Sequence, residues 1–340
     1  MLEAGAHFGD YRIESTLGRG GMGIVYRATH RVIGRTVALK LMLDELSDDD
    51  AFRERFLRES RITASIEHPN VIPIYDAGER DGRLFIAMRF VQGTDLARVL
   101  EAGSGGLDHE RAVRIVLQVA AALQAAHQRG LVHRDVKPAN VLVDEPGGGH
   151  VYLSDFGLTR LVEGGTNLTA LGDFVGTVAY CAPEQINGEP VDAAADVYAL
   201  GCVLFHMLTG QRPYERESEM AVMFAQVNAP VPDVRAIAPA VAGPLAAVVS
   251  RALAKSPGAR FASAEELACA AAAAAPAGPS RWEEPLASTP AALPSSAGEP
   301  FSVAGLLGPA RARRAVDVAL YAAGTAAFAG AGYVVTQTIG

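Results

Sequence analysis

The chain has 340 residues, of which 49% are hydrophobic and 20% are charged, so it holds enough apolar sequence for one large or two modest domains. Its formal net charge of -8 argues against a nucleic-acid partner, because nucleic-acid-binding proteins present a basic face. Cys181, Cys202 and Cys269 have no C-x-x-C or Cys/His spacing, which argues against a zinc site or disulfide framework and is typical of reduced cytosolic thiols.

The first 270 residues show two kinds of periodicity in succession. Residues 11 to 43 alternate apolar and polar positions between glycines, which predicts strands and hairpin turns. Ser47 to Asp50 offer an N-cap and an acidic first turn, which predicts a helix to about Ile66. Further strands are predicted at 71 to 75 and 84 to 90, and helices at 112 to 128, 193 to 208 and 241 to 254. The pattern indicates a small β-rich lobe followed by a larger helical lobe.

The sequence changes character after about residue 275. Seven prolines from Pro276 to Pro309 interrupt a stretch rich in Ala, Ser and Gly, which is typical of a semi-extended linker. Residues 318 to 335 carry no charge and follow Arg311, Arg313 and Arg314, which predicts a membrane-spanning helix with these arginines on the cytoplasmic side. A buried or amphipathic soluble helix is the alternative for this Ala/Gly-rich segment. The N-terminus lacks the pattern of a signal peptide, so we expect the bulk of the chain in the cytoplasm.

A glycine-rich segment follows the first predicted strand. Gly18, Gly20 and Gly23 fit G-x-G-x-x-G and are followed by Val25. Glycine lets the main chain approach a phosphate closely and direct amide N–H groups at it. The pattern alone also marks dinucleotide sites and simple hairpin turns. Here it precedes a second strand and not a helix, which argues against a dinucleotide-binding fold.

Further motifs follow in a fixed order. They are VALK at residues 37 to 40, HRDVKPAN at 133 to 140, DFG at 155 to 157, APE at 182 to 184, and the isolated Asp196 and Arg260. Each residue alone has an ordinary structural explanation, such as a helix-capping aspartate or a surface arginine. The complete ordered set, with this spacing, makes chance a poor explanation.

The motifs over residues 11 to 270 resemble those of the bacterial eukaryotic-like (Hanks-type) transmembrane Ser/Thr protein kinases. The resemblance implies an α+β, two-lobed protein kinase fold, with a β-rich N-lobe at 1–91 and a mostly helical C-lobe at 92–270. A Pro/Ala-rich juxtamembrane linker at 271–314 and a single transmembrane helix at 315–336 would follow.

The resemblance assigns the catalytic roles to three residues. Asp135 would accept or orient the proton of the substrate hydroxyl, and Lys137 would steady the transferring phosphoryl group. Lys40 would bind the α- and β-phosphates of ATP and pair with a glutamate on the first long helix. Glu59 matches that glutamate.

The implied cofactors are ATP and Mg²⁺, with Mn²⁺ as its substitute. Asn140 and Asp155 would bind the metal, since their oxygens are the hard ligands that Mg²⁺ prefers. Met88 would lie behind the adenine, which Ala38 and Leu142 would sandwich, although both are equally ordinary core residues. The full set implied to contact ATP is Leu17, Gly18, Gly20, Gly23, Val25, Ala38, Lys40, Glu59, Met88, Arg89, Val91 and Leu142.

Two other groups of residues are implied to shape the site. Arg89 and Val91 would bind adenine through main-chain groups of the hinge, residues 89 to 91, where Arg89 departs from the glutamate common in the family. Asp196 would brace the main chain of the catalytic loop, residues 133 to 140, and Glu184 would pair with Arg260.

The expected function is transfer of the γ-phosphoryl group of ATP to protein Ser/Thr hydroxyls. Thr177 would contact the catalytic loop, and autophosphorylation is expected at Thr169, with Thr166 as the second candidate. Partners would be protein substrates, a second copy of the chain in trans, and the membrane. The expected location is the cell membrane, single-pass, with the kinase domain cytoplasmic. The alternative is a pseudokinase scaffold that binds nucleotide or partners without turnover.

Overall fold

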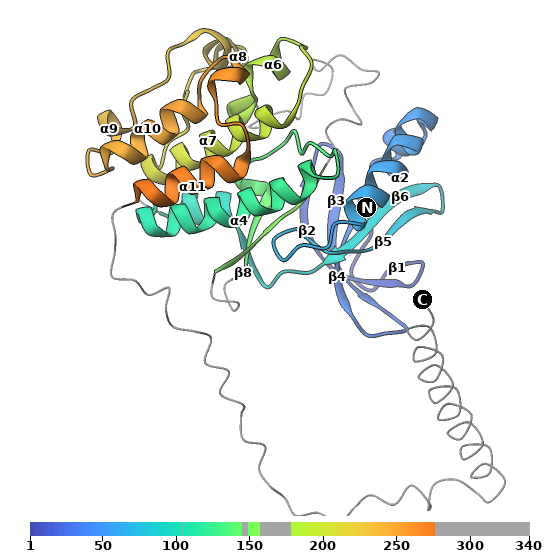
Figure 1. Cartoon of the computed structure of the whole chain (residues 1–340). Coiled ribbons are helices and arrows are strands. Elements are labelled where there is room, and N and C mark those ends of the chain that lie inside the picture. Colours follow the sequence, from blue (N-terminus) through green and yellow to red (C-terminus); the bar gives the residue numbers. More distant parts are fainter. Residues whose placement is uncertain (104, 145–148, 157–177, 276–340) are drawn as a thin grey trace, which may run out of the picture. The chain divides into compact units, whose positions relative to one another are not determined.

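The structure is a computed structural model and describes residues 1–103, 105–144, 149–156 and 178–275. These residues all belong to the first of two compact units, Met1–Pro279, and fold into two lobes (Figure 1). No helix among the described residues is long and apolar enough to cross a bilayer. The predicted span at 318 to 335 lies outside them.

The N-lobe is a six-stranded antiparallel sheet that carries one main helix. Its strands are β1 (His7–Phe8), β2 (Tyr11–Gly20), β3 (Gly23–His30), β4 (Thr36–Met42), β5 (Ile74–Arg80) and β6 (Arg83–Arg89), in the order β1-β2-β3-β4-β6-β5. The glycine-rich segment forms the β2–β3 turn, so the predicted hairpin is present. On β2, Tyr11 and Ile13 are buried while the intervening Arg12 is exposed, which is the alternation of a half-buried strand.

The main helix of the N-lobe, α2 (Asp50–Ala64), follows a short helix, α1 (Asp44–Ser47). Asp49 caps α2 by accepting the Phe52 N–H at 3.0 Å, so the cap lies two residues later than the predicted start at Ser47. Ser47 instead closes α1, where its hydroxyl accepts the Leu84 N–H of β6. Phe52 and Phe56 lie one turn apart and bury against the sheet, which fixes the face that α2 presents.

The C-lobe combines a small antiparallel sheet with a group of helices. The sheet holds β7 (Gly93–Asp95), β8 (Val141–Asp144) and β9 (His150–Leu153). The helices are α3 (Leu96–Ala102), α4 (His109–His127), α6 (Pro183–Ile186), α7 (Ala193–Thr209), α8 (Glu219–Asn228), α9 (Val234–Ile237), α10 (Gly243–Ala252) and α11 (Ala264–Ala274). The described residues of this lobe also form three single turns: η1 (Pro138–Asn140), η2 (Val178–Tyr180) and η3 (Pro257–Ala259).

The core of the C-lobe surrounds α7, which is apolar on nearly every face. Gly201 lets α7 approach α10 closely, because a Cβ there would lie 2.7 Å from the Cβ of Ala252. α11 packs on α4 and runs to Ala274, so the helical lobe extends past the expected boundary at residue 270 (Figure 1).

The strand expected at 71 to 75 is mostly wrong, because β5 begins only at Ile74. The loop between α2 and β5 is hydrogen-bonded to the C-lobe. The Asn70 side chain donates to Val151 O at 2.9 Å and to Gln118 Oε1 at 3.1 Å, and Leu153 N–H donates to Asn70 O at 2.8 Å. Val71 forms only an isolated bridge with Leu153. The end of α2 is therefore attached to the larger lobe.

Candidate active site

A cleft of about 920 Å³ lies between the β2–β3 turn, the hinge and the catalytic loop. Asp135, Lys137, Asn140 and Asp155 line it from the C-lobe side. The predicted ATP contacts that line the same cleft are Leu17, Gly18, Gly20, Gly23, Val25, Ala38, Lys40, Met88, Arg89, Val91 and Leu142. Glu59 does not line it. Residues expected to meet one nucleotide, although spread over the chain, thus share one cavity.

Gly23 is required by a close approach of two strands at the roof of the cleft. A Cβ at this position would lie 2.1 Å from the Leu41 carbonyl oxygen on β4. By contrast, a Cβ at Gly18 or Gly20 would meet nothing within 4 Å. The glycine of the motif with a packing role is therefore Gly23, while Gly18 and Gly20 leave the turn open toward the cleft.

Lys40 and Asp155 form an ion pair in the cleft. Lys40 on β4 is 8% exposed, and its Nζ lies 2.8 Å from Asp155 Oδ1. Burial acts to raise the pKa of Asp155, but the charge and hydrogen bond of Lys40, together with the charges of Lys137 and His133, hold the pKa below its usual value. Asp155 also has a left-handed φ of 63°, which for a non-glycine residue is a strained conformation found often at functional sites.

The expected ion pair between Lys40 and Glu59 is not formed among the described residues. Glu59 is 2% exposed on α2, and its Oε1 accepts from Arg58 Nη2 at 3.1 Å. Two carboxylates are available to a single ammonium, and Asp155 holds it in this structure.

Asp196 on α7 accepts hydrogen bonds from the main chain of the catalytic loop. This carboxylate is fully buried and accepts the main-chain N–H groups of His133 and Arg134, both at 2.8 Å. Its Oδ2 also lies 2.7 Å from His127 Nε2 on α4. Arg134 has a φ of 65°, so the loop turns sharply just before Asp135. Asp196 thus stabilises the conformation that presents Asp135 to the cleft.

Asp135 is itself positioned by two neighbours. Lys137 Nζ lies 2.8 Å from Asp135 Oδ2, and Asn140 Nδ2 donates to Asp135 O at 2.7 Å and to Oδ2 at 3.1 Å. Because the amide nitrogen of Asn140 is used in this way, its oxygen is the atom left to act as a metal ligand.

The donor set of the cleft fits Mg²⁺. Asp155 supplies a carboxylate whose pKa is lowered, and Asn140 supplies an amide oxygen. Mg²⁺ typically takes one or two protein oxygens together with phosphates and water, so it needs no larger cage. No cluster of three or more His, Cys, Asp or Glu side chains that would suit a metal occurs in the described part of the chain.

Phe156, which follows Asp155, packs inside the C-lobe. Its ring lies 4.6 Å from the ring of His133 and is 3% exposed. His133 Nε2 in turn lies 2.8 Å from Ser154 O. The residues on both sides of Asp155 are therefore fixed to the catalytic loop.

Glu184 on the segment α6 and Arg260, which follows η3, form a buried bidentate pair. Arg260 Nη1 and Nη2 donate to the two carboxylate oxygens at 2.6 and 2.7 Å. The adjacent Gln185 donates to Arg134 O at 2.9 Å, which connects this segment to the catalytic loop. Thr166, Thr169 and Thr177 lie outside the described residues.

Sequence reasoning missed Asp95 and the far end of the cleft. Asp95 caps α3 by accepting the Arg98 N–H at 3.0 Å and also lines the cleft. Its position before a helical segment was a signal for the cap, though not for the site. The far end is lined by Tyr180, His206, Arg212 and Glu215, which no motif connects.

A β-rich lobe, a helical lobe and a cleft with this lysine, two aspartates and asparagine define the protein kinase class. The chain matches the model of the protein kinase domain over residues 11–270 and belongs to that family, which confirms the predicted resemblance.

Several bacterial Ser/Thr kinases are similar to the chain. Serine/threonine-protein kinase PknH of Mycobacterium bovis is 47% identical over 267 residues, which are 78% of this chain and 44% of PknH. PknJ of the same organism is 44% identical over 277 residues, 80% of this chain and 46% of PknJ. The crystal structure of the Mycobacterium tuberculosis PknI kinase domain has a TM-score of 0.66 at 35% identity, over 81% of this chain and 100% of that domain. The chain spans about half the length of the curated relatives it matches.

Proposed function

We propose that the chain is a Ser/Thr protein kinase that transfers the γ-phosphoryl group of ATP to protein hydroxyls. The observation that carries the proposal is that Lys40, Asp135, Asn140 and Asp155 are all present and line one cleft beneath a glycine-rich turn. The similarity to named Ser/Thr kinases supports the choice of acceptor.

ATP would bind with its adenine against the hinge. Ala38 lines the cleft from the N-lobe and Leu142 from the C-lobe, and the two would enclose the base. Main-chain groups of Arg89 and Val91 would recognise it. Mg²⁺ on Asp155 and Asn140 would neutralise charge on the phosphates. Lys40 would then exchange its bond with Asp155 for one with the α- and β-phosphates.

The transfer needs positioning and charge more than covalent chemistry from the protein. Asp135 would accept or orient the proton of the Ser or Thr hydroxyl, whose oxygen attacks the γ-phosphorus. The bond from that phosphorus to the bridging oxygen breaks, and ADP leaves. Lys137, 2.8 Å from Asp135, is placed to steady the phosphoryl group in transit. Removing Lys40 or Asp155 should cost about 3–5 kcal/mol of transition-state stabilisation, as for other preorganised electrostatic groups.

The test is phosphate incorporation from labelled ATP by purified Lys40→Met and Asp155→Asn variants. Both are expected to lose incorporation while their circular dichroism spectra match the wild type. Turnover retained in both variants would remove these roles. A folded wild type that binds ATP but never turns it over would favour the pseudokinase scaffold.

We infer that phosphorylation of the activation loop, residues 158 to 182, at Thr169, with Thr166 as second site, switches the enzyme on. Arg134 lies beside Asp135, where a phosphate on the loop would find a guanidinium partner. Trans-phosphorylation between two copies of the chain would supply it. The rate of a Thr166→Ala, Thr169→Ala variant on an exogenous peptide tests this; wild-type activity from the variant, with the wild-type loop shown to be phosphorylated, speaks against the switch.

We also propose that the chain is anchored in the cell membrane by residues 315–336, with the kinase domain cytoplasmic. The uncharged run from 318 to 335 and the arginines before it support the proposal. Release of the full-length chain by carbonate washing would contradict it. Protein substrates would be found by phosphoproteomics that compares wild type with Asp135→Asn.

A further inference from the structure

The hinge carries a contact between the lobes that the proposed reaction does not use. Arg89 ends β6 in the N-lobe, and Tyr152 lies on β9 in the sheet of the C-lobe. The guanidinium carbon of Arg89 lies 5.1 Å from the centre of the Tyr152 ring. A cation over an aromatic face is attracted by the ring quadrupole out to about 6 Å, so this contact is within range.

The ring of Tyr152 packs behind residues that line the nucleotide cleft. Tyr152 is 7% exposed and packs in the same apolar cluster as Met88. In the β8–β9 ladder it stands opposite Leu142, which lines the cleft. Arg89 therefore covers a ring that packs with the residues expected to enclose the adenine.

Two similar contacts nearby differ in one respect. Arg35 lies 4.5 Å over the Tyr75 ring, and Arg27 lies 4.9 Å over the Phe90 ring. Arg35 and Tyr75 both belong to the N-lobe, and Arg27 joins the N-lobe to the hinge itself. Of these three contacts, the one between Arg89 and Tyr152 connects the sheets of the two lobes.

We propose that Arg89 and Tyr152 form a latch across the hinge that slows opening of the cleft and hence release of the nucleotide; this rests on the proposed function. The contact lies less than about 1 Å inside the range of the attraction, so moving the Arg89 guanidinium about 1 Å away from the Tyr152 ring takes the pair out of range. Product release limits turnover in many enzymes that close over their substrate. Arg89 acts here through Tyr152, as a positioning residue.

The latch gives a reason for arginine at position 89, where glutamate is common in the family. A glutamate would place a negative charge over the negative face of the Tyr152 ring, where it would be repelled. The latch requires a cation at residue 89 and an aromatic ring at residue 152.

The test is the dissociation rate of ADP carrying a fluorescent N-methylanthraniloyl group, in the presence of Mg²⁺, after mixing with excess ATP in a stopped-flow instrument. Arg89→Gln and Tyr152→Leu, made in the full chain, should each raise the rate about 2- to 5-fold. The double variant should be no faster than either single variant, because both remove one interaction. Tyr152→Phe keeps the ring and should keep the wild-type rate.

Arg35→Gln is the matched control, because it removes a guanidinium–tyrosine contact within one lobe and should leave the rate unchanged. Should Tyr152→Leu fail to fold, Arg89→Lys decides: it retains the cation and should keep the wild-type rate, unlike Arg89→Gln. Unchanged rates in Arg89→Gln and Tyr152→Leu, additive increases in the double variant, or an equal increase in Arg35→Gln would each overturn the latch. A folded wild type that binds no labelled ADP would overturn the proposed function as well.

Discussion

Breaking the buried ion pair between Glu184 and Arg260 is expected to destabilise the helical lobe strongly. Both residues are 3% exposed, so neither charge has water to replace its partner. Removing one member of a buried pair typically lowers the free energy of unfolding by about 3–5 kcal/mol, because the other charge stays behind without compensation.

The two members should not be equivalent. Arg260 also donates to the carbonyls of Ala194, Ala254 and Lys255, at 2.9, 2.8 and 2.9 Å. Glu184→Gln leaves these bonds in place and keeps an acceptor oxygen, so we expect the free energy of unfolding to fall by about 3 kcal/mol. Arg260→Met leaves a buried carboxylate and removes a donor from all three carbonyls, so we expect it to fall by about 5 kcal/mol.

The assay is urea unfolding followed by far-ultraviolet circular dichroism at 25 °C. Glu110→Ala is the control, because Glu110 pairs with Arg114 at 2.8 Å but the two side chains are 44% and 47% exposed. Its loss should stay within about 1 kcal/mol. A loss in Arg260→Met no larger than in Glu110→Ala would refute the reasoning that burial sets the strength of the pair.

Three further outcomes are expected. Asp196→Asn weakens the charged bonds to the catalytic loop and should lower kcat about 10- to 100-fold, with the KM for ATP nearly unchanged in steady-state kinetics. Gly23→Ala should lower the free energy of unfolding by about 1–3 kcal/mol, and Gly20→Ala by far less, since only the first meets the Leu41 carbonyl; equal losses in urea unfolding would contradict this. Burial lowers the pKa of His206 from 6.5 to about 4, so its contribution to stability is present above pH 6.5 and lost as the pH falls toward 4. Partial exposure limits that contribution to about 2 kcal/mol, and His206→Gln should flatten this part of the pH profile of unfolding.

The residues of the motifs lie together in one cleft because each motif encodes a local requirement. Gly23 must lack a side chain beside Leu41, and Asp135 and Asn140 lie on one short loop whose internal bonds set their geometry. Spacing between motifs then follows from the elements that carry them. Lys40 on β4 and Asp155 after β9 meet in the cleft as soon as the two lobes fold.

The structure differs from the predictions where a residue distant in sequence provides the hydrogen-bond or packing partner. Ser47 and Asp49 are both suitable residues for the N-cap of α2. The Ser47 hydroxyl accepts the Leu84 N–H of a distant strand, and Asp49 caps the helix. Residues 71 to 73 do not join the N-lobe sheet as predicted, because the preceding Asn70 is hydrogen-bonded to the C-lobe. The partner of Arg89 is a ring on β9, which no pattern around the hinge indicates.

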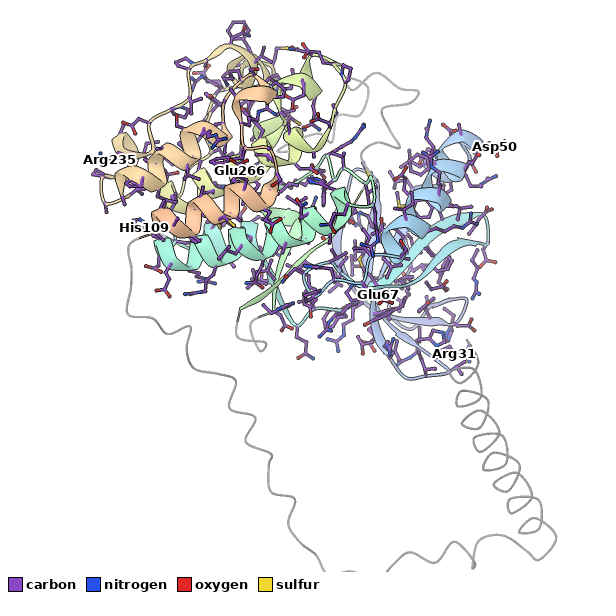
Figure 2. The ribbon with its side chains drawn as sticks, viewed as in Figure 1. Arg31, Asp50, Glu67, His109, Arg235 and Glu266 are labelled. Carbon is purple, nitrogen blue, oxygen red and sulfur yellow. The ribbon has the colours of Figure 1, made fainter. Side chains whose placement is uncertain are left out.

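The attachment of the loop at Asn70 makes α2 a lever with its fulcrum on the larger lobe. Figure 2 shows Asp50 at the outer end of α2 and Glu67 beyond its other end, closer to where the lobes meet. At 1.5 Å of rise per residue, Glu59 lies about 7.5 Å and Asp50 about 21 Å from Ala64. A swing that carries the Glu59 carboxylate about 2 Å toward Lys40 would carry the start of the helix nearly three times as far, about 6 Å. A spin label or fluorophore near Asp50 would therefore report any such swing of α2 with a larger displacement than Glu59 itself undergoes.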